Sequence, residues 1–245
     1  MRSFWTIFRF SSWRLRWTIL GWGIPLMLLG LITTPFYDLV AENERQLRPV
    51  IQGLKPLVKS FIGGEQAEEI FTPQGFLALR YFAFLPVILG IFASVAGSGM
   101  LATDEERGIL DFLLAHPAGR ASVFFGRMAA TICSLVAILL LAWVGLWLGV
   151  LRAGSLHFPP GQILLPYISV LAVSTFFLAL SLALSMMMPS RVTAAMTTGF
   201  VVLAGEIITS LAKAISQLEP AARFSPLTYF QANAIGGLHI RPVLG

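Results

Sequence analysis

The stretch from Asp104 to Arg120 concentrates the residues that could do chemistry, because it places four carboxylates between two long apolar runs. The carboxylates belong to Asp104, Glu105, Glu106 and Asp111. A glutamate pair at a membrane could cleave peptide bonds by acid–base chemistry only if histidines or further acids opposed it at membrane depth. The neighbouring apolar runs supply none. We therefore interpret the carboxylates as contact groups and not as catalysts.

The same segment carries an apolar face with helical spacing, which needs a surface to bury against. The face consists of Ile109, Leu110, Phe112 and Leu113. The acidic residues suit the first turn of a short helix that begins near Asp104, because they complement its dipole and unpaired N–H groups, and Pro117 would end it. We expect this segment to be the docking site for a soluble partner. The alternative is a solvated loop that lies on lipid headgroups.

Signatures of enzymes and metal sites are absent from the sequence. It contains no phosphate-binding loop, no nucleophile elbow and no zinc-protease helix, so we expect no catalytic residues and no ATP hydrolysis by this chain alone. The three histidines are far apart in sequence, and the single cysteine has no intrachain partner. Met186, Met187 and Met188 point in different directions on a helix and cannot chelate one copper ion. No metal site is predicted.

Glu206 lies inside an apolar run near its end. A carboxylate in a membrane is costly unless it faces a bundle interior, a partner or water. We hypothesise a role for Glu206 in the substrate pathway or in gating. The alternative is that Glu206 simply reaches water or Lys213.

The composition is that of an integral membrane protein. Hydrophobic residues make up 56% of the chain, charged residues only 12%, and the mean hydropathy is +0.79. The net charge of +5 does not indicate nucleic-acid binding, because arginines gather ahead of the first apolar run. These are Arg2, Arg9, Arg14 and Arg16. By the positive-inside rule they keep the N-terminus in the cytoplasm.

Five apolar segments are long enough to cross a bilayer, which takes about 20 helical residues. They are Trp17–Tyr37, Phe76–Ala102, Ser122–Leu151, Ile163–Met188 and Val192–Ala212. We predict an all-α polytopic transmembrane helix bundle that forms a single domain over residues 1–245. Alternation of sides makes residues 104–120 cytoplasmic and residues 38–75 external. We also expect a sixth span, which this chain does not contain. Small residues, Gly90, Ser94 and Gly97 in one run and Gly145 and Gly149 in another, favour close helix packing within the chain.

Two further helices are expected at the membrane surface. Residues 1–16 mix aromatic residues with arginines and predict an interfacial elbow helix, or else an extension of the first span. In the external loop, apolar residues recur every three or four positions between Leu47 and Phe61 and predict an amphipathic helix over residues 43–64. Pro49 would occupy its first turn, and Gly63 and Gly64 would end it.

The string E-E-R-G-I-L-D-F-L-L-A-H-P-A-G-R, from Glu105 to Arg120, resembles the coupling-helix motif E-E-x-G-T-L-x-x-L-L-x-x-P-x-x-R of ABC type-2 permeases. Ile109 replaces the usual threonine. The string F-T-P-Q-G-F-L at residues 71–77 is similar to the F-x-x-P-x-G-Y-L stretch that begins the family's second span, and S-P-L-T-Y at residues 225–229 to the S-P-x-x-Y before its sixth. The residues expected to contact the ATPase are Glu105, Glu106, Arg107, Gly108, Leu110, Phe112, Leu113, Pro117 and Arg120.

The resemblance implies the permease half of an ABC exporter in the plasma membrane of a prokaryote. Separate ABC ATPase subunits would bind ATP and Mg²⁺, and a second permease copy or homologue would complete a dimer. The implied cargo is a hydrophobic or amphipathic compound such as a drug, antibiotic, lipid or peptide. Two alternatives remain: a membrane assembly or signalling subunit that acts on an external partner through residues 43–64, and a membrane enzyme whose site is unrecognised.

Overall fold

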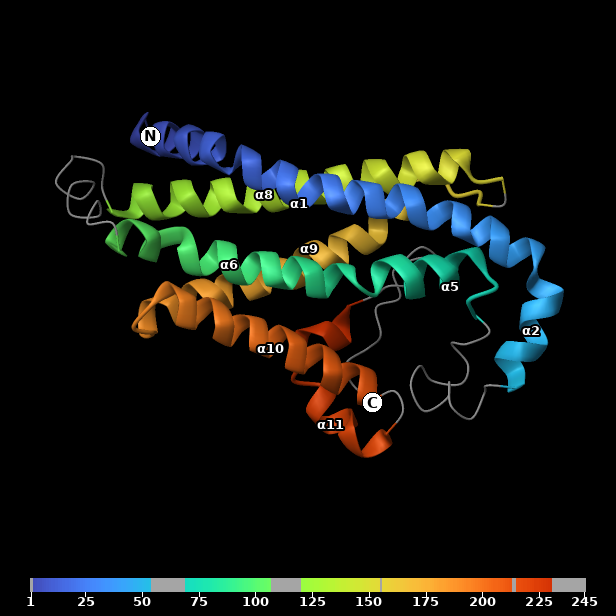
Figure 1. Cartoon of the computed structure of the whole chain (residues 1–245). Coiled ribbons are helices and arrows are strands. Elements are labelled where there is room, and N and C mark those ends of the chain that lie inside the picture. The colour runs from blue at the N-terminus through green and yellow to red at the C-terminus, as the bar shows by residue number, and fades with distance from the viewer. Residues whose placement is uncertain (1, 54–68, 107–119, 155, 213–214, 231–245) are drawn as a thin grey trace. The chain divides into compact units, whose positions relative to one another are not determined.

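The computed structural model describes residues 2–53, 69–106, 120–154, 156–212 and 215–230, and every regular element in these ranges is helical (Figure 1). The long helices are α1 (Arg2–Glu42), α6 (Leu85–Glu106), α8 (Arg120–Arg152), α9 (Pro160–Met187) and α10 (Arg191–Ala212). The short ones are α2 (Glu44–Gly53), α5 (Pro73–Leu77), η1 (Ala78–Phe82), η2 (Ser216–Leu218), α11 (Glu219–Ala222) and η3 (Pro226–Tyr229). The predicted all-α class is confirmed.

The five predicted spans are confirmed as helices long and apolar enough to cross a membrane. They cover Phe4–Glu42, Pro73–Met100, Ala121–Arg152, Gly161–Met187 and Arg191–Ala212. A helix is the element that an apolar run must form in lipid, because it satisfies every backbone N–H and C=O internally. The chain is therefore a polytopic α-helical bundle.

The first span is longer than expected, because α1 continues without a break from Arg2 to Glu42. No turn separates residues 2–16 from the span, so the structure has the continuous extension and not a separate elbow helix. The physical reason is local: the sequence between Phe4 and Trp17 contains neither proline nor glycine to interrupt the helix. The position of these turns at lipid headgroups stays a prediction.

The helix expected in the loop after α1 is present as α2. Pro49 lies at its sixth residue, so its predicted place in the first turn is wrong. Arg48 pairs with Glu44 one turn earlier and lies 5.3 Å from the ring centroid of Phe71. The rest of the predicted amphipathic helix, residues 54–64, lies outside the described residues.

The chain packs as two compact units, each of which is made of three separate stretches of sequence. Unit 1 comprises Met1–Pro25, Val87–Leu141 and Leu171–Leu203. Its core brings α6 close to α9: the Ser181 hydroxyl donates to the Ser94 carbonyl over 2.6 Å, and a Cβ added at Gly97 would lie 2.7 Å from the Leu178 carbonyl oxygen. The small residues predicted for close packing on α6 thus serve contacts within the chain.

Unit 2 comprises Leu26–Pro86, Ala142–Val170 and Ala204–Gly245. Here α1 packs on α8 through the predicted Gly145 and Gly149 pair. A Cβ at Gly145 would collide with the Met27 carbonyl, and one at Gly149 would collide with the Thr34 hydroxyl. Gly30 faces α8 in the same way, 2.7 Å from the Leu146 nitrogen by the same measure. Close backbone approach is what a G-x-x-x-G pair permits in membrane helices.

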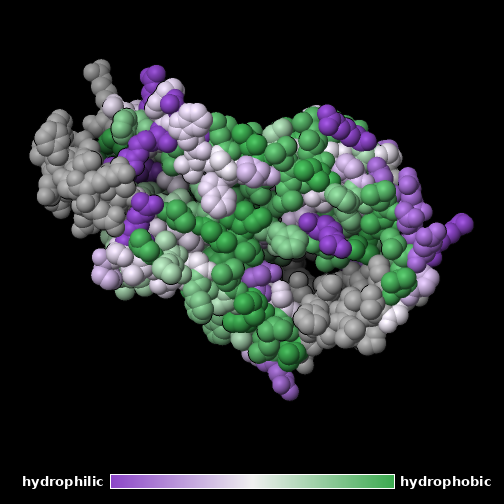
Figure 2. Space-filling view, in the orientation of Figure 1, coloured by the Kyte–Doolittle hydropathy of each residue, from purple (hydrophilic) through white to green (hydrophobic). Residues whose placement is uncertain are grey.

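Large apolar side chains also cover much of the surface, as Figure 2 shows. On α10 they follow one stripe, consisting of Val192, Met196, Phe200, Leu203, Ile207 and Leu211. Exposure of this extent would drive a water-soluble protein to aggregate, whereas lipid chains solvate it. The surface agrees with the membrane class that composition predicts.

Candidate functional site

The predicted docking segment, residues 104–120, begins in the last turn of α6 and ends at the first residue of α8. Because α6 runs to Glu106, Asp104, Glu105 and Glu106 lie in its last turn, and Arg120 is the first residue of α8. The helix start expected near Asp104 is therefore wrong. No helix breaker occurs in the sequence between Gly99 and Gly108, so the apolar helix continues through the acidic residues. The other predicted contact residues, Arg107, Gly108, Leu110, Phe112, Leu113 and Pro117, lie outside the described residues.

Arg127 ties these two helices together within unit 1. Its guanidinium donates to the Met100 carbonyl over 3.0 Å, and the Thr131 hydroxyl donates to the Arg127 carbonyl over 3.0 Å. The same hydroxyl lies 3.8 Å from the Met100 sulfur. A charge-assisted bond between spanning helices is strong where water is scarce. The C-terminal part of α6 and the N-terminal part of α8 are therefore held together by this hydrogen bond.

Sequence reasoning did not single out Arg127. The available signal was a charged residue seven positions into α8, just inside an apolar run, where charge generally marks function or a specific partner. Its partner is a backbone carbonyl, which no pattern of side chains reveals.

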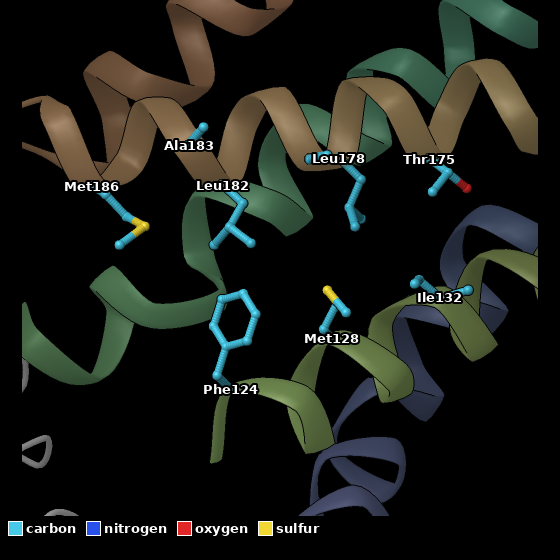
Figure 3. Close-up of a pocket in the computed structure, with 9 residues that line it drawn as sticks. Phe124, Met128, Ile132, Thr175, Leu178, Leu182, Ala183 and Met186 are labelled. Atoms are coloured by element: carbon cyan, nitrogen blue, oxygen red, sulfur yellow. The ribbon is translucent and has the colours of Figure 1, made fainter. Parts of the chain in front are cut away.

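An apolar groove of about 310 Å³ lies between α8 and α9 in unit 1. Figure 3 shows Phe124, Met128 and Ile132 from α8 facing Leu178 and Leu182 from α9. The lining is completed by Thr175, Ala179, Ala183 and Met186. Among the described lining residues, only Thr175 brings a polar side chain, and its hydroxyl already donates to the Leu171 carbonyl over 2.7 Å. Such a surface suits an apolar ligand or an acyl chain, and flexible methionines adapt to either.

A buried tyrosine pair joins three helical segments of unit 2. The hydroxyls of Tyr81 and Tyr167 lie 2.9 Å apart, and Tyr81 also donates to the Ala142 carbonyl at 3.3 Å. Tyr81 belongs to the π-helix η1, whose wider turn interrupts the second span. Phe82 packs edge-on against Tyr167, with ring centroids 5.3 Å apart. Sequence reasoning missed this pair because the two residues lie 86 positions apart, although π-helical turns are frequent at functional sites.

The F-T-P-Q-G-F-L stretch forms a capped helix start. Thr72 is the N-cap of α5: its hydroxyl accepts from the Gly75 nitrogen at 3.1 Å and donates to the Glu69 carbonyl at 2.7 Å. Pro73 follows in the first turn, where its missing N–H costs nothing. A Cβ at Gly75 would collide with the Glu69 carbonyl, so the motif's glycine permits a tight chain reversal.

The S-P-L-T-Y stretch packs on α10 in unit 2. Ser225 caps η3, and its hydroxyl lies 3.2 Å from the Gly205 carbonyl. The hydroxyls of Thr209 and Thr228 are 3.2 Å apart. Both contacts fix η3 against the half of α10 that carries Glu206.

Glu206 is half-buried, next to the Gly205 contact. Its carboxylate accepts a hydrogen bond from the Ser210 hydroxyl at 3.2 Å, one turn along α10. Lys213, the alternative partner considered from sequence, lies outside the described residues. Within the described residues, the structure thus gives Glu206 one local donor, Ser210.

Apolar spanning helices, close glycine contacts and an arginine-tied helix pair define a polytopic α-helical membrane protein. Comparison with protein families then identifies the kind: the sequence model of the ABC-2 family transporter proteins matches residues 14–231, and the chain belongs to this family. No curated protein and no solved structure matches the chain. Membership makes the chain an ABC permease, a transmembrane subunit that works with ABC ATPase subunits. The family resemblance found from the motifs is confirmed.

Proposed function

We propose that the chain is the permease subunit of an ABC exporter and that residues 104–120 dock onto a separate ATPase subunit. The family match over residues 14–231 carries this proposal. In this arrangement the ATPase binds ATP and Mg²⁺, and the permease binds neither. A second permease copy or homologue completes the translocation unit, and the complex resides in a prokaryotic plasma membrane with the N-terminus of the chain in the cytoplasm.

The Arg127 bond supports the mechanical part of the proposal. Closure of the ATPase domains must move spanning helices, so the docking segment needs rigid attachment at both of its ends. The bond from Arg127 to the Met100 carbonyl links the two helices that flank the segment. A displacement of residues 107–119 would then be passed to α6 and α8 together.

The apolar groove supports a hydrophobic or amphipathic cargo. Its lining offers dispersion contacts and almost no hydrogen-bonding groups, so it would favour an apolar chain or ring over a sugar or an ion. Phe125 and Phe176, which follow the lining residues Phe124 and Thr175 in sequence, are exposed apolar side chains of α8 and α9. A cargo dissolved in the membrane could reach the groove laterally, without crossing water.

Filling the groove tests this proposal. Ala179→Phe adds a ring to the lining of the groove, and we expect it to reduce stimulation of ATPase activity by amphipathic dyes severalfold in the reconstituted complex. Ala172→Phe adds the same bulk two turns earlier on an exposed position of α9 outside the groove and should leave stimulation intact. Equal stimulation in wild type and Ala179→Phe would exclude the groove as the cargo site.

Glu206 is proposed to act in the substrate pathway or in gating, because it is a half-buried carboxylate within a spanning helix. Glu206→Gln retains its shape and its bond with Ser210 but removes the charge. We expect the variant to fold normally and to lose transport-coupled ATPase activity by roughly tenfold, the scale of one charged interaction. Unchanged coupled activity would remove Glu206 from the pathway.

A further inference from the structure

The first turns of α1 form a basic and aromatic face that the proposed transport cycle does not use. Thr6, Arg9, Phe10, Trp13 and Arg16 occupy positions i, i+3, i+4, i+7 and i+10 of the helix and line a hollow of about 840 Å³. This spacing places them on one side of the helix. All of its lining residues belong to α1, so the hollow is an open surface of one helix.

The two arginines set the charge of the hollow. Arg9 and Arg16 are seven residues apart, which separates them by about 10 Å along the helix axis. In the described part of the chain, no carboxylate lies within salt-bridge distance of either guanidinium. Two exposed guanidinium groups on one face attract an anion, and planar N–H donors suit phosphate oxygens.

Trp13 and Trp17 fix the direction of Arg16. Its guanidinium carbon lies 3.8 Å from the Trp13 ring centroid and 5.5 Å from that of Trp17. Stacking of this kind occupies the face of the guanidinium and leaves its N–H edges for an acceptor. Ser12 also lines the hollow, and its hydroxyl has no hydrogen-bond partner within the described ranges.

The surface next to the hollow is apolar in the direction of the span. Trp13 and Trp17 are 67% and 70% exposed, and Leu20 and Ile24 continue the exposed stripe along α1. Tryptophan rings are enriched where lipid headgroups meet acyl chains. A ligand that meets this surface in full must combine an anionic head with apolar chains.

We propose that this face of α1 is a binding site for an anionic phospholipid. Arg9 and Arg16 hold the phosphate, Trp13 forms the floor beside it, and the acyl chains lie along Leu20 and Ile24. A phospholipid offers a phosphate to the two arginines and acyl chains to the apolar stripe. A free anion would engage the arginines alone, so the lipid is the ligand that fits both features.

The test measures which lipids the full transporter complex retains from mixed nanodiscs of phosphatidylcholine and phosphatidylglycerol. Bound lipids are counted by native mass spectrometry after gentle extraction. We expect wild type to retain phosphatidylglycerol preferentially, and Arg9→Gln and Arg16→Gln each to weaken its retention by roughly tenfold. Arg16→Lys keeps the charge but loses the planar fork, so its retention of phosphatidylglycerol should lie between that of wild type and that of Arg16→Gln.

Arg14→Gln is the matched control, because it removes the same charge from the same helix and does not line the hollow. Normal retention in this variant supports the site. Equal losses of phosphatidylglycerol retention in Arg9→Gln, Arg16→Gln and Arg14→Gln would show that only the net charge of the helix matters. That result would overturn the proposal. Displacement of the lipid by inorganic phosphate alone would make a free anion the ligand. Unchanged lipid retention with loss of a protein subunit would make the face a protein interface. Either result would also overturn it.

Discussion

Replacement of Leu110, Phe112 and Leu113 by aspartate is expected to release the ATPase subunits from the permease. Each buried apolar side chain contributes about 1.5–3 kcal/mol, so loss of all three weakens association by on the order of a thousandfold or more. New carboxylates beside Glu105, Glu106 and Asp111 would add repulsion wherever the partner is acidic. The ratio of ATPase to permease after affinity purification measures the effect.

A conservative triple variant controls for damage to the segment. Leu110→Met, Phe112→Leu and Leu113→Met keep the face apolar and should keep the ATPase bound, because hydrophobic substitutions of similar size are tolerated best. Both variants should elute as monodisperse protein with unchanged Tm. Retention of the ATPase by the aspartate variant at the wild-type ratio would contradict docking through this face.

Gly145→Leu is expected to disrupt the packing of α1 on α8. Any Cβ at this position meets the Met27 carbonyl and its neighbouring backbone atoms, which cannot rotate away as a side chain can. Overpacking costs about 1–3 kcal/mol even in compliant cores. We expect Tm in detergent to fall by roughly 2–12 °C, with loss of monodisperse protein.

Gly199→Leu provides the comparison for the same substitution in a spanning helix. In the described part of the chain, no atom outside the neighbouring backbone of α10 lies within 4 Å of a Cβ built at Gly199, so the leucine should be accommodated with little change in Tm. Similar destabilisation of the two variants would show that leucine is harmful for a reason other than the close contact of α1 with α8.

The spanning helices were predictable because apolar length is a local property of the sequence. The limits of the helices depended on caps and breakers: Thr72 and Pro73 start the second span before the expected Phe76, and a sequence without proline or glycine before Trp17 lets α1 begin at Arg2. Acidic residues suggested a helix start at Asp104, but helix propensity carried α6 through them to Glu106.

Tertiary partners could not be read from the sequence. The pair of Gly145 and Gly149 indicated close packing, but nothing in their spacing identified α1 as the partner. Arg127 bonds to a backbone carbonyl, and Tyr81 meets Tyr167 across 86 positions of chain. The groove between α8 and α9 likewise depends on how two uniformly apolar helices meet. Such features follow from packing geometry, which residue types alone leave open.

The most direct measurement is the composition of the complex purified gently from native membranes through a tag on this chain, with subunits quantified by mass spectrometry. Permease function with a separate energy source predicts an ABC ATPase at close to one copy per permease chain, together with a second permease copy or homologue. Absence of any nucleotide-binding subunit, from preparations in which the tagged chain is folded and monodisperse, would contradict that function.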